Sequence, residues 1–342
     1  MSLTALQTIW YVLIGVLLTG YAILDGFDLG AGVLLPFVAR EDRERRLVFH
    51  AIGPFWDGNE VWLLTGAGAL FAAFPPVYAT VFSGFYLAMM LVLFALIVRA
   101  VSFEFRSKVE EPRWRRAWDW TFFVSSLLPA LLLGVAMGNV VRGVPLTAER
   151  EYAGGLLPLL NPFSLLVGAA GLAMFVTHGA IYLLTKTDGP VAERARRAAV
   201  AGWTALIVLA VLSAVGVALD APERLANFRR TPLAWVVPAL LVAFLVLTRL
   251  DLARGKNGRA FLFSSLTIAG LMGMVGAGNF PYLLPARNVP EYGLSIYNAS
   301  ASQNTLTAML VIALIGMPLV IAYTAYVYYV FRGQVRATEE GY

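Results

Sequence analysis

Four carboxylates lie within strongly apolar sequence, where ionisable groups are costly. Asp25 and Asp28 are three residues apart in the first apolar stretch, and Asp57 and Glu60 repeat that spacing in the second. Residues at this spacing are neighbours on a helix surface, so each pair is expected to share one helix face. A charged group costs about 2.5–3.5 kcal/mol in a membrane helix and therefore faces a bundle interior or a wet cavity, where proton relay is a common use. The four acids therefore predict a proton path.

Each pair also has a plainer interpretation. Asp25 and Asp28 are solvated if they end a helix in water, although the apolar run that follows them argues against full exposure. Asp57 suits the first turn of a helix, where an acid caps free N–H groups and complements the dipole. Capping does not exclude proton transfer, so we treat Asp57 as the main relay acid and Glu60 as an optional partner.

The composition defines the class of protein that must position these acids. Of 342 residues, 59% are hydrophobic and 14% are charged, and the mean hydropathy is +0.72. Stretches of about 20 apolar residues, long enough to cross a bilayer, recur along the chain. They are continuous rather than alternating, which excludes a transmembrane β-barrel. The fold class is therefore an all-α polytopic membrane protein, and the net charge of +5 reflects topology rather than nucleic-acid binding.

Nine membrane spans are expected, in a single membrane domain over residues 1–342. They cover residues 8–39, 54–73, 77–99, 118–138, 161–185, 198–219, 233–250, 260–281 and 306–331. All but six of the 26 Lys and Arg residues fall on one side of this alternation; the six are Arg142, Arg150, Arg224, Arg229, Arg230 and Arg287. The positive-inside rule then places the N-terminus outside and the C-terminus in the cytoplasm, with the four acids toward the cytoplasm.

A faint internal repeat divides the chain. Ser125-Ser126-Leu127 precedes Gly138-Asn139, and Ser264-Ser265-Leu266 precedes Gly278-Asn279. The match suggests a pseudo-repeat of residues 1–140 and 161–285, in which two four-helix bundles are followed by one extra helix at 306–331.

Cofactor ligands are scarce. Cys is absent and His occurs only at positions 50 and 178, which excludes thiolate-bound metals and disfavours a multi-histidine site. His178 lies within an apolar span and is chemically able to ligate haem, but a single intramembrane His is more often a hydrogen-bonded bundle residue. We expect no metal and no firmly assigned cofactor on this chain.

Several sequence strings together resemble subunit II of cytochrome bd-type quinol oxidases, nearly end to end from about residue 8 to 331. The strings are Leu24-Asp-Gly-Phe-Asp-Leu-Gly30, Trp56-Asp-Gly-Asn-Glu-Val-Trp62, Phe71-Ala-Ala-Phe-Pro75, Ser83-Gly-Phe-Tyr86, Phe105-Arg-Ser-Lys108, Arg113-Trp-Arg-Arg-Ala-Trp-Asp119, Gly138-Asn139, Asn161-Pro-Phe163 and Phe263-Ser-Ser-Leu266.

This resemblance implies nine helices, as two four-helix bundles plus one peripheral helix, in a bacterial cytoplasmic membrane. It implies a haem-bearing subunit I as partner, carrying two b-type haems, one haem d and the quinol site, in a complex that reduces O2 to water. A small single-helix subunit and a structural quinone occur in some relatives. It also implies that Asp57 is the key acid of a cytoplasmic proton route and that Asp28 is associated with it, whereas some relatives have Gln in place of His178.

Two other classes of function fit the residues alone. A proton-coupled secondary transporter suits weak repeats and acid-bearing helices interrupted by glycine, and a structural scaffold needs no proton traffic. A transporter is expected to act alone and colourless, whereas an oxidase subunit is expected to copurify with a haem-bearing chain.

Overall fold

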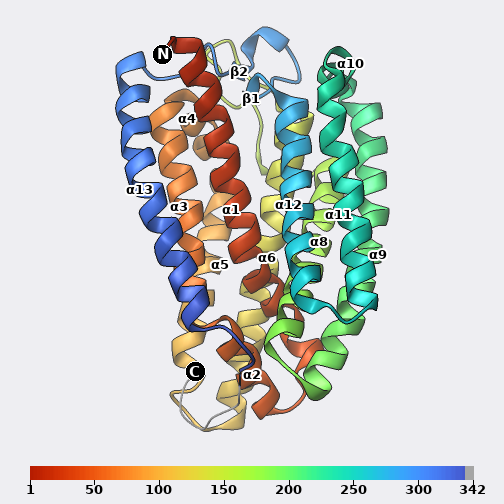
Figure 1. The fold of residues 1–342 in the computed structure, drawn as a ribbon. Coiled ribbons are helices and arrows are strands. Elements are labelled where there is room, and N and C mark those ends of the chain that lie inside the picture. Colours follow the sequence, from red (N-terminus) through yellow and green to blue (C-terminus); the bar gives the residue numbers. More distant parts are fainter. Residues whose placement is uncertain (336–342) are drawn as a thin grey trace.

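The computed structural model describes residues 1–335 as a bundle of long helices that run nearly parallel to one another (Figure 1). The helices are α1 Leu3–Val38, α2 Asp42–Ile52, α3 Trp56–Ala73, α4 Pro75–Gly84, α5 Tyr86–Phe105, α6 Pro112–Arg142, α7 Leu156–Leu159, α8 Pro162–Lys186, α9 Gly189–Asp220, α10 Ala226–Arg230, α11 Val236–Ala253, α12 Asn257–Asn279 and α13 Gln303–Val330. Short 3-10 turns occur at Pro222–Leu225, Pro232–Trp235 and Pro290–Tyr292, and the strands β1 Tyr282–Leu284 and β2 Leu294–Ser295 pair antiparallel.

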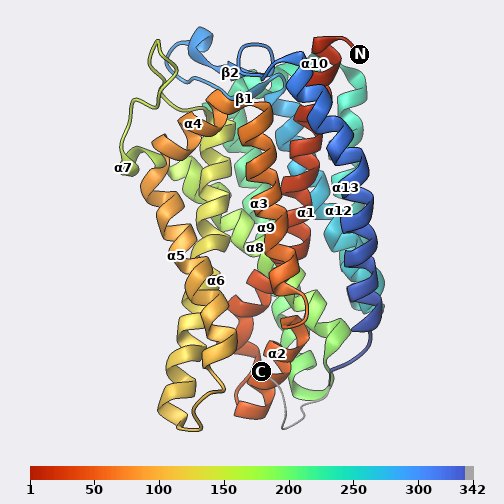
Figure 2. The same ribbon diagram turned by 90° about the vertical axis from the view of Figure 1, so that its left-hand side faces the viewer.

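Eight helices within residues 1–335 are long and apolar enough to cross a membrane: α1, α5, α6, α8, α9, α11 (with the turn before it), α12 and α13. This confirms the polytopic all-α class. The helix α3 falls outside this set, because Asp57, Asn59 and Glu60 occupy its first turns. It nevertheless runs alongside α1 and α13 (Figure 2).

The expected third span, 77–99, differs in the structure. It is two helices, α4 and α5, separated at Phe85. Gly84 just before the break lacks a side chain, and the ring of Tyr152 packs where a Cβ would lie. The helix α5 then continues to Phe105, so Arg99, the last residue of the expected span, lies well inside a helix.

Local sequence signals explain where the long helices begin. The hydroxyl of Ser2 accepts a hydrogen bond from the Ala5 amide at 3.3 Å, and the Asn161 side chain accepts one from the Ser164 amide at 2.9 Å. These caps satisfy amides that have no partner within the helix. Pro162 follows Asn161 at the first helical position, where its missing N–H costs nothing.

The helix α1 forms the centre of the bundle, and its second half is buried almost continuously from Asp25 to Leu35. It crosses α8 at Gly30 and Gly179, so closely that a Cβ on either glycine would overlap backbone atoms of the other helix. Small residues at such crossings allow the close approach that stabilises membrane helix pairs. The crossing fixes the depth of Asp25 and Asp28 in the bundle.

Candidate functional site

The side chains of Asp25 and Asp28 are completely buried on α1. The expectation that the apolar sequence after them prevents exposure is therefore confirmed. Because the two residues share one face of α1, both carboxylates point toward α3 and α5, which supply their partners.

Arg99 of α5 joins two of the acids. Its Nη1 donates to Asp25 Oδ1 and to Glu60 Oε1, each at 2.8 Å. The side chains of Arg99 and Asp25 are 0% exposed, and that of Glu60 is 21% exposed. A buried guanidinium that bridges two carboxylates from different helices ties α1, α3 and α5 together.

Asp28 has a different environment, because its hydrogen-bond partner is neutral. Asn59 of α3 donates to Asp28 Oδ2 at 2.7 Å and to the Leu24 carbonyl oxygen at 3.1 Å. Tyr328 of α13 donates to Asn59 Oδ1 at 3.2 Å. An amide does not neutralise a carboxylate, so Asp28 is the acid of the group best suited to hold a proton itself.

The buried cluster has more hydrogen-bonding capacity than the described residues use. Asp25 Oδ2, Asp28 Oδ1, and the Nε and Nη2 atoms of Arg99 are buried and have no hydrogen-bond partner within residues 1–335. Buried polar atoms are nearly always satisfied in folded proteins, by other protein groups or by ordered water.

Asp57 lies apart from this cluster. It lies in the first turn of α3 and is exposed on the side of that helix that faces away from the bundle. It is close enough to Glu60 for the two charges to interact. The shared-face expectation thus holds for Asp25 and Asp28 but only in part for Asp57 and Glu60. The structure brings Asp25, Asp28 and Glu60 together and places Asp57 at their outer edge.

Sequence reasoning missed Arg99 and gave no role to Asn59 or Tyr328. The available signal for Arg99 was its apolar context, Leu96-Ile-Val-Arg-Ala-Val101, which suits an intramembrane cation as well as a helix end. Such a residue needs a buried carboxylate partner, and Asp25 was the obvious candidate.

The ring of His178 is buried and engaged at both nitrogens. Nδ1 lies 2.7 Å from Ser264 Oγ, and Nε2 lies 3.0 Å from the Ile23 carbonyl oxygen. A carbonyl only accepts, so Nε2 carries the proton and Nδ1 accepts from the hydroxyl. The ring also stacks on Phe261. This geometry leaves neither nitrogen for haem iron, and no group of three or more metal-ligating side chains occurs within residues 1–335.

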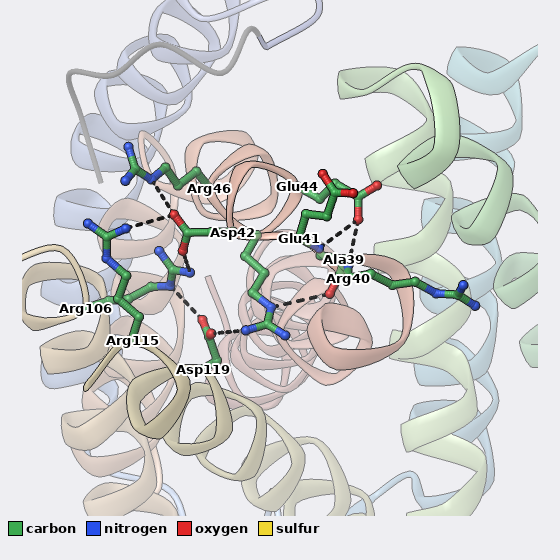
Figure 3. A network of polar contacts seen from close by, with 10 residues as sticks. Ala39, Arg40, Glu41, Asp42, Glu44, Arg46, Arg106, Arg115 and Asp119 are labelled. Atoms are coloured by element: carbon green, nitrogen blue, oxygen red, sulfur yellow. Dashed lines mark hydrogen bonds and ion pairs between the residues drawn. The ribbon is translucent and has the colours of Figure 1, made fainter. Parts of the chain in front are cut away.

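A second polar network surrounds α2 (Figure 3). Arg106, which is 1% exposed, donates through Nε to Asp119 Oδ1 at 2.6 Å and through Nη2 to Asp42 Oδ1 at 2.8 Å. Arg45 donates to the other oxygen of Asp119 at 2.7 Å, and Arg115 donates to Asp42 at 3.0 Å. The network holds α2 against the ends of α5 and α6.

We expect Asp42 to stabilise α2 in a pH-dependent way. Burial alone would raise the pKa of Asp42, but the hydrogen bond and charge of Arg106, assisted by Arg115, outweigh it, so the pKa lies below its usual value. A lowered folded-state pKa adds stability above the unfolded pKa, about 3.9, which is lost as the pH falls through the folded pKa. Asp42→Asn should lower the thermal midpoint at pH 7, and the difference from wild type should shrink below about pH 4. Asp188→Asn, at an exposed acid, is the control, and an equal effect of both variants would refute the assignment.

The fold and site define a polytopic helical membrane protein whose core holds a buried cluster of ionisable side chains. Residues 6–331 match the family described as cytochrome bd terminal oxidase subunit II. The chain is 41% identical to Escherichia coli K12 cytochrome bd-I ubiquinol oxidase subunit 2, with 96% of this chain and 95% of that protein covered. It is 36% identical to Bacillus subtilis cytochrome bd ubiquinol oxidase subunit 2, with 98% and 99% covered.

A solved structure shares the fold. The bd oxidase of Geobacillus thermodenitrificans contains a chain that superimposes with a TM-score of 0.78 at 21% identity, over 96% of this chain and 98% of that one. The chain therefore belongs to the cytochrome bd terminal oxidase subunit II family and is one subunit of a terminal oxidase. This result confirms the resemblance and sets aside the transporter alternative.

Proposed function

We propose that this chain is the haem-free subunit of a quinol:O2 oxidoreductase in a bacterial cytoplasmic membrane, and that it supplies a proton route to the site of O2 reduction. Two of its relatives are named ubiquinol oxidase subunits. The haems b and d belong to the partner subunit in this proposal, which agrees with the engagement of both His178 nitrogens within this chain.

The proposed proton route is supported by the way the exposure of the four acids decreases from the surface to the interior of the bundle. Asp57 is exposed, Glu60 is partly exposed, and Asp25 and Asp28 are fully buried. A route of this kind needs groups that alternate between protonated and ionised forms within reach of one another. Arg99 holds Asp25 and Glu60 in place, and Asp28, bonded only to a neutral amide, carries the proton within the buried part of the route.

The outward face of α3 is the proposed contact with the haem-bearing subunit. Asp57 and Gly58 are exposed there, and so are Val61, Leu64 and Phe71 further along the helix. An exposed carboxylate and the low hydropathy of α3 fit a protein neighbour better than lipid chains.

The proposed topology has nine crossings, with α3 as a crossing and with α4 and α5 sharing one. Helices α1 to α6 form one four-helix unit, α8 to α12 form the second, and α13 lies outside both. In this topology the α2 end of the bundle, which carries the excess of basic residues, is cytoplasmic. Figure 1 shows the start of α1 at the opposite end, which fits an outer N-terminus.

The test of the route is Asp57→Asn, which keeps shape and hydrogen bonding but cannot exchange a proton. O2 consumption per assembled complex should fall at least about tenfold, since a positioned proton donor contributes roughly 10²–10⁴-fold. Assembly is measured by a reduced-minus-oxidised absorption spectrum and native mass. Glu104→Gln, at another exposed acid, is the control. An unchanged rate in a fully assembled Asp57→Asn complex would exclude the relay role.

A further inference from the structure

Lys186, the last residue of α8, is a buried cation that has no carboxylate partner among residues 1–335. The residue is 7% exposed. The other buried cations within residues 1–335, Arg99, Arg106 and Arg224, each have a carboxylate within ion-pair distance. Lys186 instead donates to the Phe331 carbonyl oxygen at 2.6 Å. Lys186 is therefore the one buried cation within residues 1–335 whose charge is not balanced by a carboxylate.

The groups around Lys186 hold the ammonium in place without neutralising it. Nζ lies 5.1 Å from the ring centre of Phe55 and 5.9 Å from that of Tyr182. Cation–π contacts and a carbonyl dipole offset part of the desolvation cost. A buried charge is nevertheless normally accompanied by an opposite charge. Only one of the three ammonium hydrogens is used by Phe331, so the group retains donors for an anion.

A cavity of about 280 Å³ opens beside Lys186. It lies between the end of α2, the segment that leads into α3, the end of α8 and the chain that follows α13. Arg332 and His50 also line it, and its described lining contains no Asp or Glu. The volume lies just below the usual range for ligand pockets, about 300–1,000 Å³, and suits a compact ligand such as a phosphate ester.

This cavity is distinct from the carboxylate cluster. None of Asp25, Asp28, Glu60 and Arg99 lines it. The ring of Phe55 forms part of its wall and packs against Tyr328 at 4.5 Å between ring centres. The hydroxyl of Tyr328 faces the other way, toward Asn59. An aromatic layer thus separates a cationic cavity at the end of the bundle from an acidic cluster inside it.

We propose that this cavity is a binding site for a phosphate-bearing anion, held by Lys186 and Arg332. The ammonium of Lys186 supplies a fixed charge. The guanidinium of Arg332 is exposed and stacks on Tyr329 at 4.0 Å from the ring centre, and in this proposal it turns to supply paired donors that match phosphate oxygens. The bound anion neutralises Lys186 and connects α2, α8 and the chain after α13. Two sources share this chemistry: the headgroup of an anionic phospholipid and a free phosphate.

The test is the thermal unfolding of the purified oxidase complex, titrated with three probes at constant ionic strength. The probes are inorganic phosphate, a short-chain phosphatidylglycerol and a phosphatidylcholine of the same chain length. A ligand that binds the folded state raises the midpoint in a saturable way. We expect phosphate or phosphatidylglycerol to protect the wild-type complex in a saturable way. In Lys186→Gln the apparent affinity should fall about tenfold, because one charge-assisted hydrogen bond is lost. Lys108→Gln, at an exposed lysine elsewhere, should bind like wild type.

The three probes separate the two sources. If both anions raise the unfolding midpoint, free phosphate is sufficient for binding. If only phosphatidylglycerol raises it, the ligand is the lipid headgroup. Either result supports the site. If Lys186→Gln does not assemble, Arg332→Gln replaces it, because Arg332 is exposed and outside the helices. Equal protection of wild type and both variants, or none by either anion, overturns the proposal. The same titration is made on a variant that ends at Val335. If the anions protect only that variant, the acids of the removed C-terminal residues compete with them, and the proposal is wrong. The readout does not involve O2 turnover, so it is independent of the proposed proton route.

Discussion

Replacement of Arg99 by methionine should prevent assembly of the oxidase complex or reduce it severely. Methionine fills a similar volume but leaves Asp25 fully buried, and Glu60 largely so, without a counter-charge. Removing one partner of a buried ion pair costs about 3–5 kcal/mol, which is a large share of the stability of most proteins. The measurement is the yield of haem-containing complex after gentle purification, compared with Arg113→Met at an exposed arginine.

Charge and shape can be separated in the same experiment. If uncompensated charge causes the defect, the triple variant Arg99→Met with Asp25→Asn and Glu60→Gln should recover much of the yield, because the two carboxylates that Arg99 pairs with are then neutral. Arg99→Lys should be intermediate, since one ammonium does not reproduce the geometry of a guanidinium between two carboxylates. Normal assembly of Arg99→Met would show that the bridge is dispensable.

Arg99 also shows where sequence reasoning ended. Hydropathy is a local property, so the apolar stretches and the unusual position of Asp25 and Asp28 within them were predictable. The pairing of Arg99 with Asp25 joins residues 74 positions apart, and local patterns carry no information about it. Because basic residues near predicted span ends usually mark the cytoplasmic surface, the charge pattern predicts a span that ends at Arg99, whereas α5 continues beyond it to Phe105.

The contrast between Asp57 and Glu60 has a related cause. Spacing on a helix fixes the relative direction of two side chains but not which side of the helix faces the bundle. The rotation of α3 is set by Asn59 and Gly66, which are buried, with Asn59 bonded to Leu24 and Asp28 of α1. That rotation turns Glu60 partly inward and leaves Asp57 outside. The roles of a surface acid and an inner acid therefore follow from tertiary contacts.

Replacement of Asp28 by asparagine should lower O2 consumption while leaving assembly intact. The new amide can turn its oxygen toward the Asn59 donor that now bonds Asp28 Oδ2, so shape and hydrogen bonding survive but proton exchange does not. If Asp28 carries protons inward, the rate per assembled complex should fall on the order of a hundredfold, as expected for a lost proton-transfer group. The measurement is O2 uptake normalised to haem content.

Two variants distinguish proton transfer from a purely structural role of Asp28. Asp28→Glu keeps an exchangeable proton and should restore part of the rate, which a loss of packing does not explain. Asp251→Asn makes the same change at a buried acid of α11 that pairs with Arg259, outside the cluster, and should leave the rate near wild type. If Asp28→Asn and Asp251→Asn behave alike, or if Asp28→Asn lowers haem content and rate in parallel, Asp28 anchors α3 to α1 rather than carrying protons. A rate defect specific to Asp28→Asn and relieved by glutamate requires an exchangeable proton at this position.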